Sequence, residues 1–215
     1  MGAILATSQT KPSSETVERA AEVLRSGGVV VLPTDSVYGI CCAATPGNPA
    51  HERIFDIKHR DRAQTLPWFV ADAADLAVYG RNVPEWALRL AERYWPGALT
   101  IVVRASDAVP PEYAQPGEGG ATIALRVPDS PLDRAIARAV GSPLAQTSAN
   151  THGAPAATSG AGLESAIVDA VDLVLDAGAA PVGVASTIVD ATGIEPRVLR
   201  AGALTGAEVL LVEHI

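Results

Sequence analysis

The order of apolar and polar residues predicts a helix followed by a buried strand near the start of the chain. Ser13-Ser14 offers a helix cap, and the apolar residues that follow, up to Leu24, are spaced three or four apart. This spacing predicts an amphipathic helix that ends at Gly27-Gly28. Residues 29–32 then read Val-Val-Val-Leu between Gly and Pro, which is typical of a strand buried on both faces.

Helical and strand patterns continue to alternate along the rest of the chain. Asn48 and Pro49 have the residue types of a helix cap and first turn, and we expect this helix to end near Lys58. The remaining patterns predict strands at 66–70, 99–103, 122–127, 144–147, 172–175, 186–189 and 197–199, and helices at 72–79, 84–94, 130–140 and 162–169. Because helices and strands interleave, we expect an α/β fold with a largely internal sheet. Strands that follow one another without a helix in the last third imply antiparallel pairs as well.

Two long segments carry neither a helical nor a strand pattern. Residues 110–120 are rich in Pro and Gly, and residues 148–162 are rich in Ser, Ala, Thr and Gly. Loops of this length are often lids or binding loops. No linker or internal repeat divides the chain, so we expect one domain over 13–205, between tails at 1–12 and 206–215.

Composition narrows the class of protein. Apolar residues make up 48% of the 215 residues, which excludes general disorder. The apolar runs are shorter than the ~20 residues that a membrane helix needs, and the N-terminus lacks the basic region of a signal peptide. We therefore expect a soluble, cytoplasmic protein without a membrane partner. The net charge of −8 disfavours broad attraction to nucleic acid and leaves room for a local basic cleft.

Common catalytic and metal-binding motifs are absent from the sequence. The chain has neither a GxxxxGK[ST] phosphate loop nor a GxGxxG dinucleotide motif, and neither GxSxG nor HExxH. Cys41 and Cys42 are adjacent and lack the spacing of a zinc site. We expect them to be small buried apolar residues, and we expect no metal site built from protein side chains.

One lysine stands out in a chain that otherwise uses arginine. The basic residues are fourteen Arg and two Lys, and Lys58 is the only lysine outside the N-terminal tail. Arg60 follows two residues later. Cations at the end of a helix complement the helix dipole, which accounts for the pair without any ligand. The alternative is that both residues contribute to a site for an anion.

Short polar segments follow several predicted strands, where open α/β sheets bind ligands. On the strand at 122–126, alternation places Thr122, Ala124 and Arg126 on one face and the apolar residues on the other. Singly, each polar residue fits turn or cap chemistry. Together with Lys58 and Arg60 they offer cations and small donors with few carboxylates, which indicates a phosphate-bearing ligand. The other polar residues at strand ends are Thr34, Ser36, Gln146, Ser148, Asn150, Ser186 and Arg200.

Seven short segments follow one another in a recognisable order. They are PTDSVYGI at 33–40, Lys58-His59-Arg60, WPGALT at 95–100, TIALRVP at 122–128, Ser148-Ala149-Asn150, STIVD at 186–190 and LRAG at 199–202. In combination they resemble the YrdC/Sua5 family of L-threonylcarbamoyladenylate synthases, from about Val17 to Gly202. The resemblance implies an open, twisted, mixed parallel and antiparallel sheet with flanking helices around a large basic cleft. We also expect the additional C-terminal Sua5 domain of longer members to be missing.

The resemblance implies the adenylation of a carbamate, in which L-threonine, bicarbonate and ATP give threonylcarbamoyl-AMP and pyrophosphate. The product would serve the downstream machinery that makes t6A in tRNA, and Mg²⁺ would be held by the phosphates of ATP rather than by protein. Lys58 and Arg60 would be catalytic, because cations neutralise the charge that grows on the departing pyrophosphate. The residues implied for ATP are Lys58, Arg60, Gln64, Thr122, Ser148, Asn150 and Arg200, and those implied for threonine are Thr34, Ser36, Arg126, Gln146 and Ser186.

The segment after Arg60 departs from the family pattern. Asp61 stands in place of Pro, Gln64-Thr65-Leu66 replaces a unit of Asn or Lys followed by Pro-Leu, and Phe69 stands where a His is expected. The phosphate-handling residues are therefore kept better than the amino-acid pocket. Two alternatives stay open: a paralogue that forms a different carbamoyl-adenylate, and a non-catalytic module that binds RNA weakly through its basic cleft.

Overall fold

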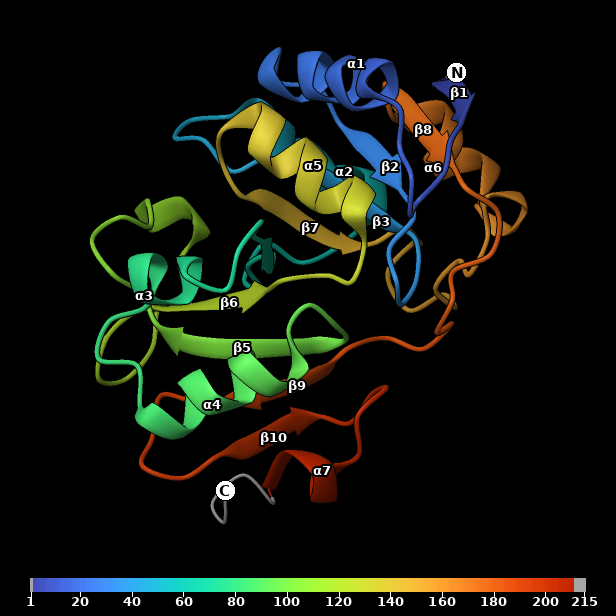
Figure 1. Ribbon diagram of the computed structural model, residues 1–215. Coiled ribbons are helices and arrows are strands. Elements are labelled where there is room, and N and C mark those ends of the chain that lie inside the picture. Colours follow the sequence, from blue (N-terminus) through green and yellow to red (C-terminus); the bar gives the residue numbers. More distant parts are fainter. Residues whose placement is uncertain (1, 211–215) are drawn as a thin grey trace.

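The computed structural model describes residues 2–210, in which ten strands form one sheet (Figure 1). The strands are β1 (Ala3–Ala6), β2 (Val30–Leu32), β3 (Gly39–Ala43), β4 (Trp68–Phe69), β5 (Leu99–Arg104), β6 (Thr122–Arg126), β7 (Leu144–Ser148), β8 (Leu173–Asp176), β9 (Thr187–Asp190) and β10 (Arg197–Arg200). Their order across the sheet is β1-β8-β2-β3-β7-β4-β6-β5-β9-β10. Residue 1 and residues 211–215, which end the predicted C-terminal tail, lie outside the described residues.

Parallel and antiparallel pairs are mixed in this sheet. β8 pairs in parallel with both β1 and β2, and the pairs β4–β6 and β5–β9 are also parallel. The other neighbouring strands run antiparallel, including β9 and β10 near the C-terminus. The α/β class and the open mixed sheet expected from the sequence are confirmed.

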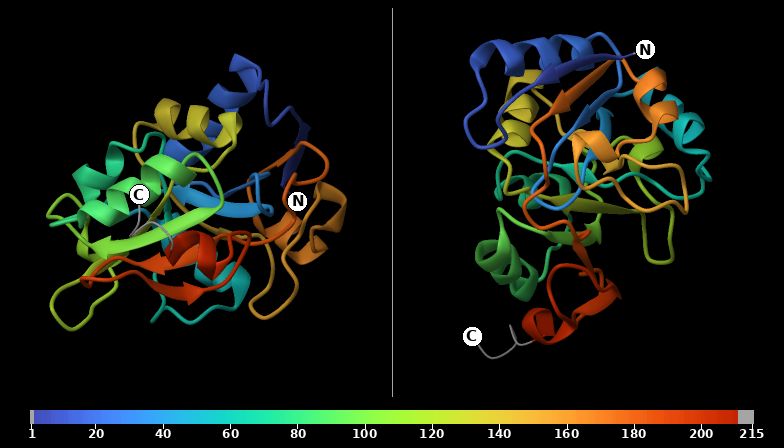
Figure 2. Two further views of the ribbon diagram at one scale, coloured as in Figure 1. Left: turned by 60° about the horizontal axis from the view of Figure 1, so that its bottom comes forward. Right: turned by 90° about the vertical axis from the view of Figure 1, so that its right-hand side faces the viewer.

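Helices flank both faces of the sheet. They are α1 (Ser14–Arg25), α2 (Pro49–Lys58), α3 (Asp75–Tyr79), α4 (Glu85–Tyr94), α5 (Pro131–Val140), α6 (Ser165–Ala170) and α7 (Gly206–Leu210). α1 and α5 pack against each other and against β2, β3 and β4, whereas α2 packs against β3 and α6. Figures 1 and 2 show α1 and α7 at opposite ends of the molecule.

Side-chain caps start the helices that matter most for the site. The Asn48 side chain accepts a hydrogen bond from the backbone N–H of Ala50, and Pro49 occupies the first turn of α2. α2 ends because His59 adopts a left-handed backbone conformation, with φ of 51°. Lys58 is therefore the last helical residue, and the chain changes direction before Arg60.

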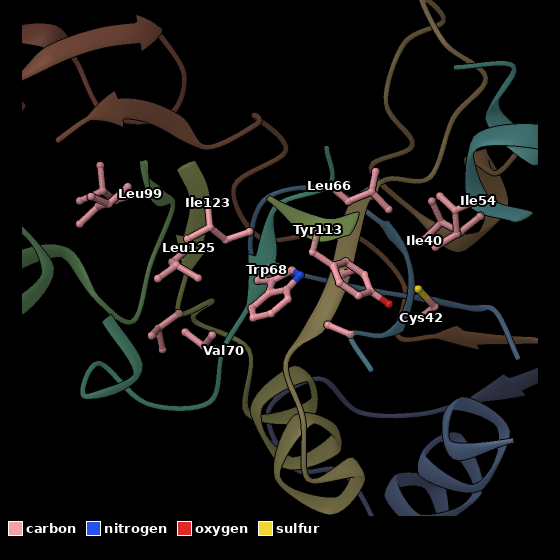
Figure 3. Packing of buried hydrophobic residues seen from close by; sticks show 14 of the residues in the cluster. Ile40, Cys42, Ile54, Leu66, Trp68, Val70, Leu99, Tyr113, Ile123 and Leu125 are labelled. Carbon is pink, nitrogen blue, oxygen red and sulfur yellow. The ribbon is translucent and has the colours of Figure 1, made fainter. Parts of the chain in front are cut away.

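The larger hydrophobic core lies on the face of the sheet that packs against α2 and α4 (Figure 3). At its centre Trp68 contacts Tyr79 and Tyr113, with ring centroids 5.1 Å and 5.4 Å apart in edge-to-face geometry. Ile123 and Leu125 of β6 point into this core. Their neighbours on β6 consequently point to the opposite face, as the alternation in the sequence predicted. A second core lies between that opposite face and the helices α1 and α5.

Two strands form where the sequence analysis named none. β1 lies within the segment expected to be a tail, where it pairs with β8 at one edge of the sheet. β3 contains Gly39 and the two cysteines, and its small residues lack the alternation that marks a strand. Cys41 and Cys42 are buried, as expected. The helices within residues 2–210 are too short or too polar to span a lipid bilayer.

Candidate active site

A cavity of 450 Å³ lies over the face of the sheet that carries Ala124 and Arg126. Its walls come from the turn after β2, the segment after α2, and the strands β5, β6, β7, β9 and β10. Three arginines line it, and among the described residues no carboxylate side chain does. Its polar lining residues are Thr34, Ser36, Tyr38, Arg60, Gln64, Thr65, Thr100, Gln115, Arg126, Gln146, Thr147, Ser148, Ser186 and Arg200.

Arg60 and Arg200 bring two positive charges to one part of the cavity. Arg60 donates hydrogen bonds to Thr147 Oγ1 at 3.0 Å and to the carbonyl of Thr65 at 3.3 Å. Burial lowers the pKa of Arg60, and the nearby charge of Arg200 lowers it further. Two guanidinium groups that remain charged and repel each other favour an anion placed between them.

Arg200 is held in place by the backbone of the neighbouring strand. Its Nη2 donates to the carbonyl of Ser186 at 2.8 Å and to Ser186 Oγ at 3.2 Å. Ser186 Oγ also lies 2.8 Å from Thr100 Oγ1. Burial lowers the pKa of Arg200, followed by the charge of Arg126. The three arginines therefore influence one another across a single cavity.

Arg126 forms the most deeply buried ion pair of the site. Its side chain and that of Asp35 are 2% and 7% exposed, and Arg126 Nη2 lies 2.6 Å from Asp35 Oδ1. Nη1 donates to Ser36 Oγ at 2.8 Å, and Nε donates to the carbonyl of Gly97 at 2.9 Å. The ring of Phe69 packs below the guanidinium, with its centroid 5.1 Å away. Burial lowers the pKa of Arg126, which the charge of Asp35 opposes.

The turn after β2 is closed by a buried hydroxyl. Thr34 Oγ1 accepts from the backbone N–H groups of Ser36 and Val37 at 3.0 Å and 3.2 Å, and lies 3.0 Å from Ser36 Oγ. These bonds give hydrogen-bond partners to backbone N–H groups of a tight turn that lies outside the β-sheet. The turn thereby fixes Ser36 and Asp35 against Arg126.

Lys58 is close to the cavity but does not line it. The residue is 2% exposed, and its ammonium donates to the backbone carbonyls of Ser148 and Asn150. Burial lowers the pKa of Lys58 to about 8, with a further contribution from Arg60. Ser148 itself lines the cavity. In this conformation Lys58 holds the loop after β7 and reaches the cavity only through that loop.

Most of the residues singled out from the sequence meet at the cavity. Those that line it are Thr34, Ser36, Arg60, Gln64, Arg126, Gln146, Ser148, Ser186 and Arg200, and those outside its lining are Lys58, Thr122 and Asn150. Asn150 instead donates through Nδ2 to the carbonyls of Thr151 and Ala154, which orders the loop after β7.

Sequence reasoning gave no site role to five polar lining residues, which are Tyr38, Thr65, Thr100, Gln115 and Thr147. Thr100 belongs to the WPGALT segment, so its place on the same face as Val102 was a usable signal. Thr147 ends the strand predicted at 144–147, and its hydroxyl was not assigned to the site. Gln115 lies in a loop without a pattern, and its Oε1 accepts from the backbone N–H of Thr65 at 3.2 Å. No local signal in the sequence predicted that contact.

The arrangement supports binding of an extended anion rather than covalent catalysis by a side chain. Arginine guanidinium groups and small hydroxyls line the cavity at several points. Such groups bind phosphate and carboxylate oxygens and stabilise charge that develops during group transfer.

Comparison with known proteins places the chain in a family. The sequence profile of the family Sua5_yciO_yrdC, described as telomere recombination, matches residues 22–202. A threonylcarbamoyl-AMP synthase from Pyrococcus abyssi is 35% identical over 88% of this chain and 55% of that protein. The crystal structure of P. abyssi Sua5 complexed with L-threonine has a TM-score of 0.90 and 32% identity, over 98% of this chain and 61% of that one.

A shorter solved structure matches along its whole length. E. coli YciO has a TM-score of 0.84 and 29% identity, over 98% of this chain and 100% of that chain. By contrast, the chain spans only 55% and 58% of the lengths of the first two curated relatives that it matches. The profile covers most of the chain, and both identity and fold agree with it. The chain therefore belongs to the Sua5/YciO/YrdC family.

Proposed function

We propose that the protein is a nucleotidyltransferase that makes L-threonylcarbamoyl-AMP from L-threonine, bicarbonate and ATP, with release of pyrophosphate. The observation that carries this proposal is that Arg60 and Arg200 lie close together at one cavity. Among residues 2–210, no carboxylate side chain lines that cavity. Relatives named threonylcarbamoyl-AMP synthase, and the related Sua5 structure that holds L-threonine, support it.

The chemistry needs charge neutralisation rather than a protein nucleophile. The amine of threonine and bicarbonate give a carbamate and water, and a carbamate oxygen then attacks the α-phosphorus of ATP. The bond to the β-phosphate oxygen breaks, and pyrophosphate leaves with its electron pair. Arg60 and Arg200 would bind the phosphates and stabilise the charge on the leaving group. Ser148 would add a hydroxyl at the cavity wall, while Gln64 lines the same cavity.

Lys58 would contribute to ATP binding through the loop that it holds. Its two carbonyl partners, Ser148 and Asn150, belong to the segment after β7. An ammonium has three N–H donors, so one remains beyond these two bonds. Thr122 lies on the same strand face as Ala124 and Arg126, outside the cavity lining, and would act only at the margin of a bound nucleotide.

The amino acid would bind at the end of the cavity formed by Arg126. A guanidinium has five N–H donors, and three of those of Arg126 are engaged with Asp35, Ser36 and Gly97. The remaining donors suit a carboxylate. Thr34, Gln146 and Ser186 line the same cavity and supply hydroxyl and amide groups, which suits recognition of a hydroxyl-bearing side chain.

Magnesium fits this scheme as a complex with the nucleotide. No cluster of three His, Cys, Asp or Glu side chains suited to a metal occurs within residues 2–210. The cavity lining supplies no carboxylate in that range. Phosphate oxygens and water are the usual ligands of Mg²⁺ bound with ATP. The ion would therefore enter with ATP and add positive charge beside Arg60 and Arg200.

The proposed product determines the expected cellular context. An activated threonylcarbamoyl group would be passed to tRNA by a separate t6A-forming machinery, which we expect in the cytoplasm where ATP, bicarbonate and tRNA meet. The net charge of −8 opposes direct contact with RNA.

Pyrophosphate release tests the proposed reaction. With ATP and bicarbonate present, we expect release to depend on L-threonine and to exceed that seen with serine, valine and the other amino acids. Mass spectrometry of the adenylate identifies the acyl group. Equal release with every amino acid would contradict threonine as the acceptor, and none with any of them would contradict the synthase.

A second acceptor is favoured by one specific contact. Phe69 packs below Arg126 at the position where the family pattern has His, so the amino-acid end of the cavity is more apolar than that pattern suggests. A paralogue that forms another carbamoyl-adenylate would fit this change. If so, Phe69→His should create or raise threonine use, and an unchanged amino-acid profile would speak against it.

A further inference from the structure

Asp133 is a buried carboxyl group that the proposed reaction does not use. It lies in the first turn of α5, where its backbone N–H donates to the capping Ser130 Oγ at 3.3 Å. The residue is 1% exposed. Neither Oδ1 nor Oδ2 makes a hydrogen bond of good geometry to another described residue. A buried carboxyl without such partners calls for an explanation in structure or function.

Burial and the charge of Asp35 favour the protonated form of Asp133. Asp35 and Arg126 face it from the turn after β2 and from β6, and Cys41 and Gln146 face it from β3 and β7. Arg126 is already paired with Asp35, so an ionised Asp133 would leave a net negative charge there. Burial raises the pKa of Asp133 well above its ordinary value and Asp35 raises it further, whereas Arg126 and then the side chains of Ser130 and Gln146 lower it by less.

The side-chain amide of Gln146 connects Asp133 with the cavity. Gln146 is 0% exposed and lines the cavity, yet neither Nε2 nor Oε1 has a well-formed hydrogen bond within residues 2–210. Nε2 lies against Gly39, where any Cβ would collide with it. Gly39 also lines the cavity. An unpartnered amide at that wall is available to a ligand.

A neutral carboxyl can fix the direction of this amide. It can donate its O–H to Gln146 Oε1, which an ionised carboxylate cannot do. The Oε1 atom then faces Asp133, and Nε2 is left as a donor at the wall beside Gly39. Arg126 and Ser36 supply donors at the same end of the cavity. Together they form a set of donors that matches the carboxylate of an amino acid.

We propose that Asp133, in its protonated form, is a positioning residue that orients the Gln146 amide toward the carboxylate of the amino-acid substrate. The proposal rests on the proposed function for the identity of that substrate. It assigns Asp133 to the amino-acid end of the cavity and gives it no part in ATP binding.

Steady-state kinetics over a range of pH tests this role with two variants. Asp133→Asn keeps a donor and cannot ionise, so we expect a KM for threonine near that of the wild type and without pH dependence from this residue. Asp133→Leu removes the donor, and we expect its threonine KM to rise about tenfold, the size of one lost hydrogen bond. The KM for ATP should change less than twofold in both. Exposed Asp129→Asn is the matched control.

Three kinetic outcomes would overturn the role. The first is an equal loss of threonine affinity in Asp133→Asn and Asp133→Leu. The second is an equal change in the KM values for threonine and ATP, and the third is a threonine KM that is unchanged in both variants. Melting temperatures identify any variant that fails to fold. Asp133→Asn is the decisive variant, because it preserves the size of the side chain.

Protonation can be measured without any substrate. An acid whose folded pKa is raised stabilises the protein below its unfolded pKa, and this contribution is lost as pH rises toward the folded value. The free energy of unfolding should therefore fall with pH more steeply in the wild type than in Asp133→Asn. The NMR signals of the Gln146 side-chain amide can be assigned by their loss in Gln146→Leu. These signals should shift with pH only when Asp133 is present.

These measurements separate the two proposals. The role of Asp133 is overturned, even if threonine is the substrate, if stability depends on pH in the same way in the wild type and in Asp133→Asn and the Gln146 NMR signals do not shift with pH. A protein with the expected profiles that releases no pyrophosphate with threonine instead contradicts the proposed function.

Discussion

Arg126 and Asp35 form a buried ion pair at the wall of the cavity, with 2.6 Å between Nη2 and Oδ1. The pair joins the turn after β2 to β6, which lies across β3, β7 and β4 in the sheet. The pair thus spans five neighbouring strands of the sheet, from β2 to β6, where the ligand would bind. The pair is therefore part of the fold as well as of the site.

Breaking this pair should destabilise the protein strongly. Arg126→Met leaves the carboxylate of Asp35 buried without its cation, and such a change lowers the free energy of unfolding by ~3–5 kcal/mol. Urea denaturation measures the loss. The control is Arg81→Met, because the partner of Arg81, Asp107, is 98% exposed and surface pairs contribute about 0–1 kcal/mol. Similar losses in the two variants would contradict a structural role for the buried pair.

Removing Arg60 should affect ATP use far more than stability. Arg60→Ala takes away a guanidinium whose own pKa is lowered by burial and by Arg200. We expect kcat/KM for ATP to fall by about 10²-fold, the scale of losing one donor to developing charge. The free energy of unfolding should change by no more than ~1 kcal/mol, because relief of the repulsion with Arg200 offsets the loss of the hydrogen bonds to Thr147 and Thr65.

The matched control for this change lies two residues away. Arg62 is exposed and pairs with Glu52 and Asp56 outside the cavity. Arg62→Ala should leave kcat/KM for ATP within twofold of the wild type. Pyrophosphate release at varied ATP compares the two variants, and an equal effect of both would indicate general attraction of ATP by surface charge.

Lys58 should make stability depend on pH in the alkaline range. Its folded pKa of about 8 lies below the ordinary value of 10.5, so the unfolded chain binds more protons between these values. Stability from this residue therefore rises as pH increases from about 8 to 10.5, by at most about 1.4 kcal/mol per pH unit. A neutral amine can still donate to the carbonyls of Ser148 and Asn150.

Comparison with Lys58→Met isolates this contribution. Tyrosines and cysteines also titrate above pH 8, but they do so in both proteins. We expect the wild type to gain stability relative to Lys58→Met between pH 8 and 10.5, as measured by urea denaturation at several pH values. A constant difference across that range would mean that Lys58 keeps an ordinary pKa in the folded protein.

The sequence predicted the elements whose residues alternate or repeat clearly. Strand β6 is the best example, because Ile123 and Leu125 enter the core and Ala124 and Arg126 face the cavity, as expected. Strand β3 was missed because Gly39 and its small neighbours give no contrast between faces. Periodicity predicts which face a side chain takes only where the two faces differ in polarity.

The part of the site that escaped prediction depends on contacts between distant segments. The ammonium of Lys58 is directed at Ser148 and Asn150, 90 and 92 residues later in the chain. That direction follows from the left-handed turn at His59 and from the path of the loop after β7. The residues around Lys58 do not indicate either feature. A lysine at this place therefore suggested a phosphate ligand, whereas in the fold its ammonium holds the loop after β7.

Gly202 should be intolerant of any side chain for steric reasons alone. A Cβ there would collide with the backbone of Ala185 and Ser186, and the carbonyl of Ser186 is the group that holds Arg200. Gly202→Ala should therefore lower the free energy of unfolding by ~1–3 kcal/mol, as overpacking does, and should also raise the KM for ATP by displacing Arg200. Gly206→Ala is the control, because a Cβ at Gly206 meets nothing within 4 Å. If both substitutions are equally harmless, the contact between the segment after β10 and the segment before β9 is more adaptable than its short distances indicate, and Arg200 does not depend on it.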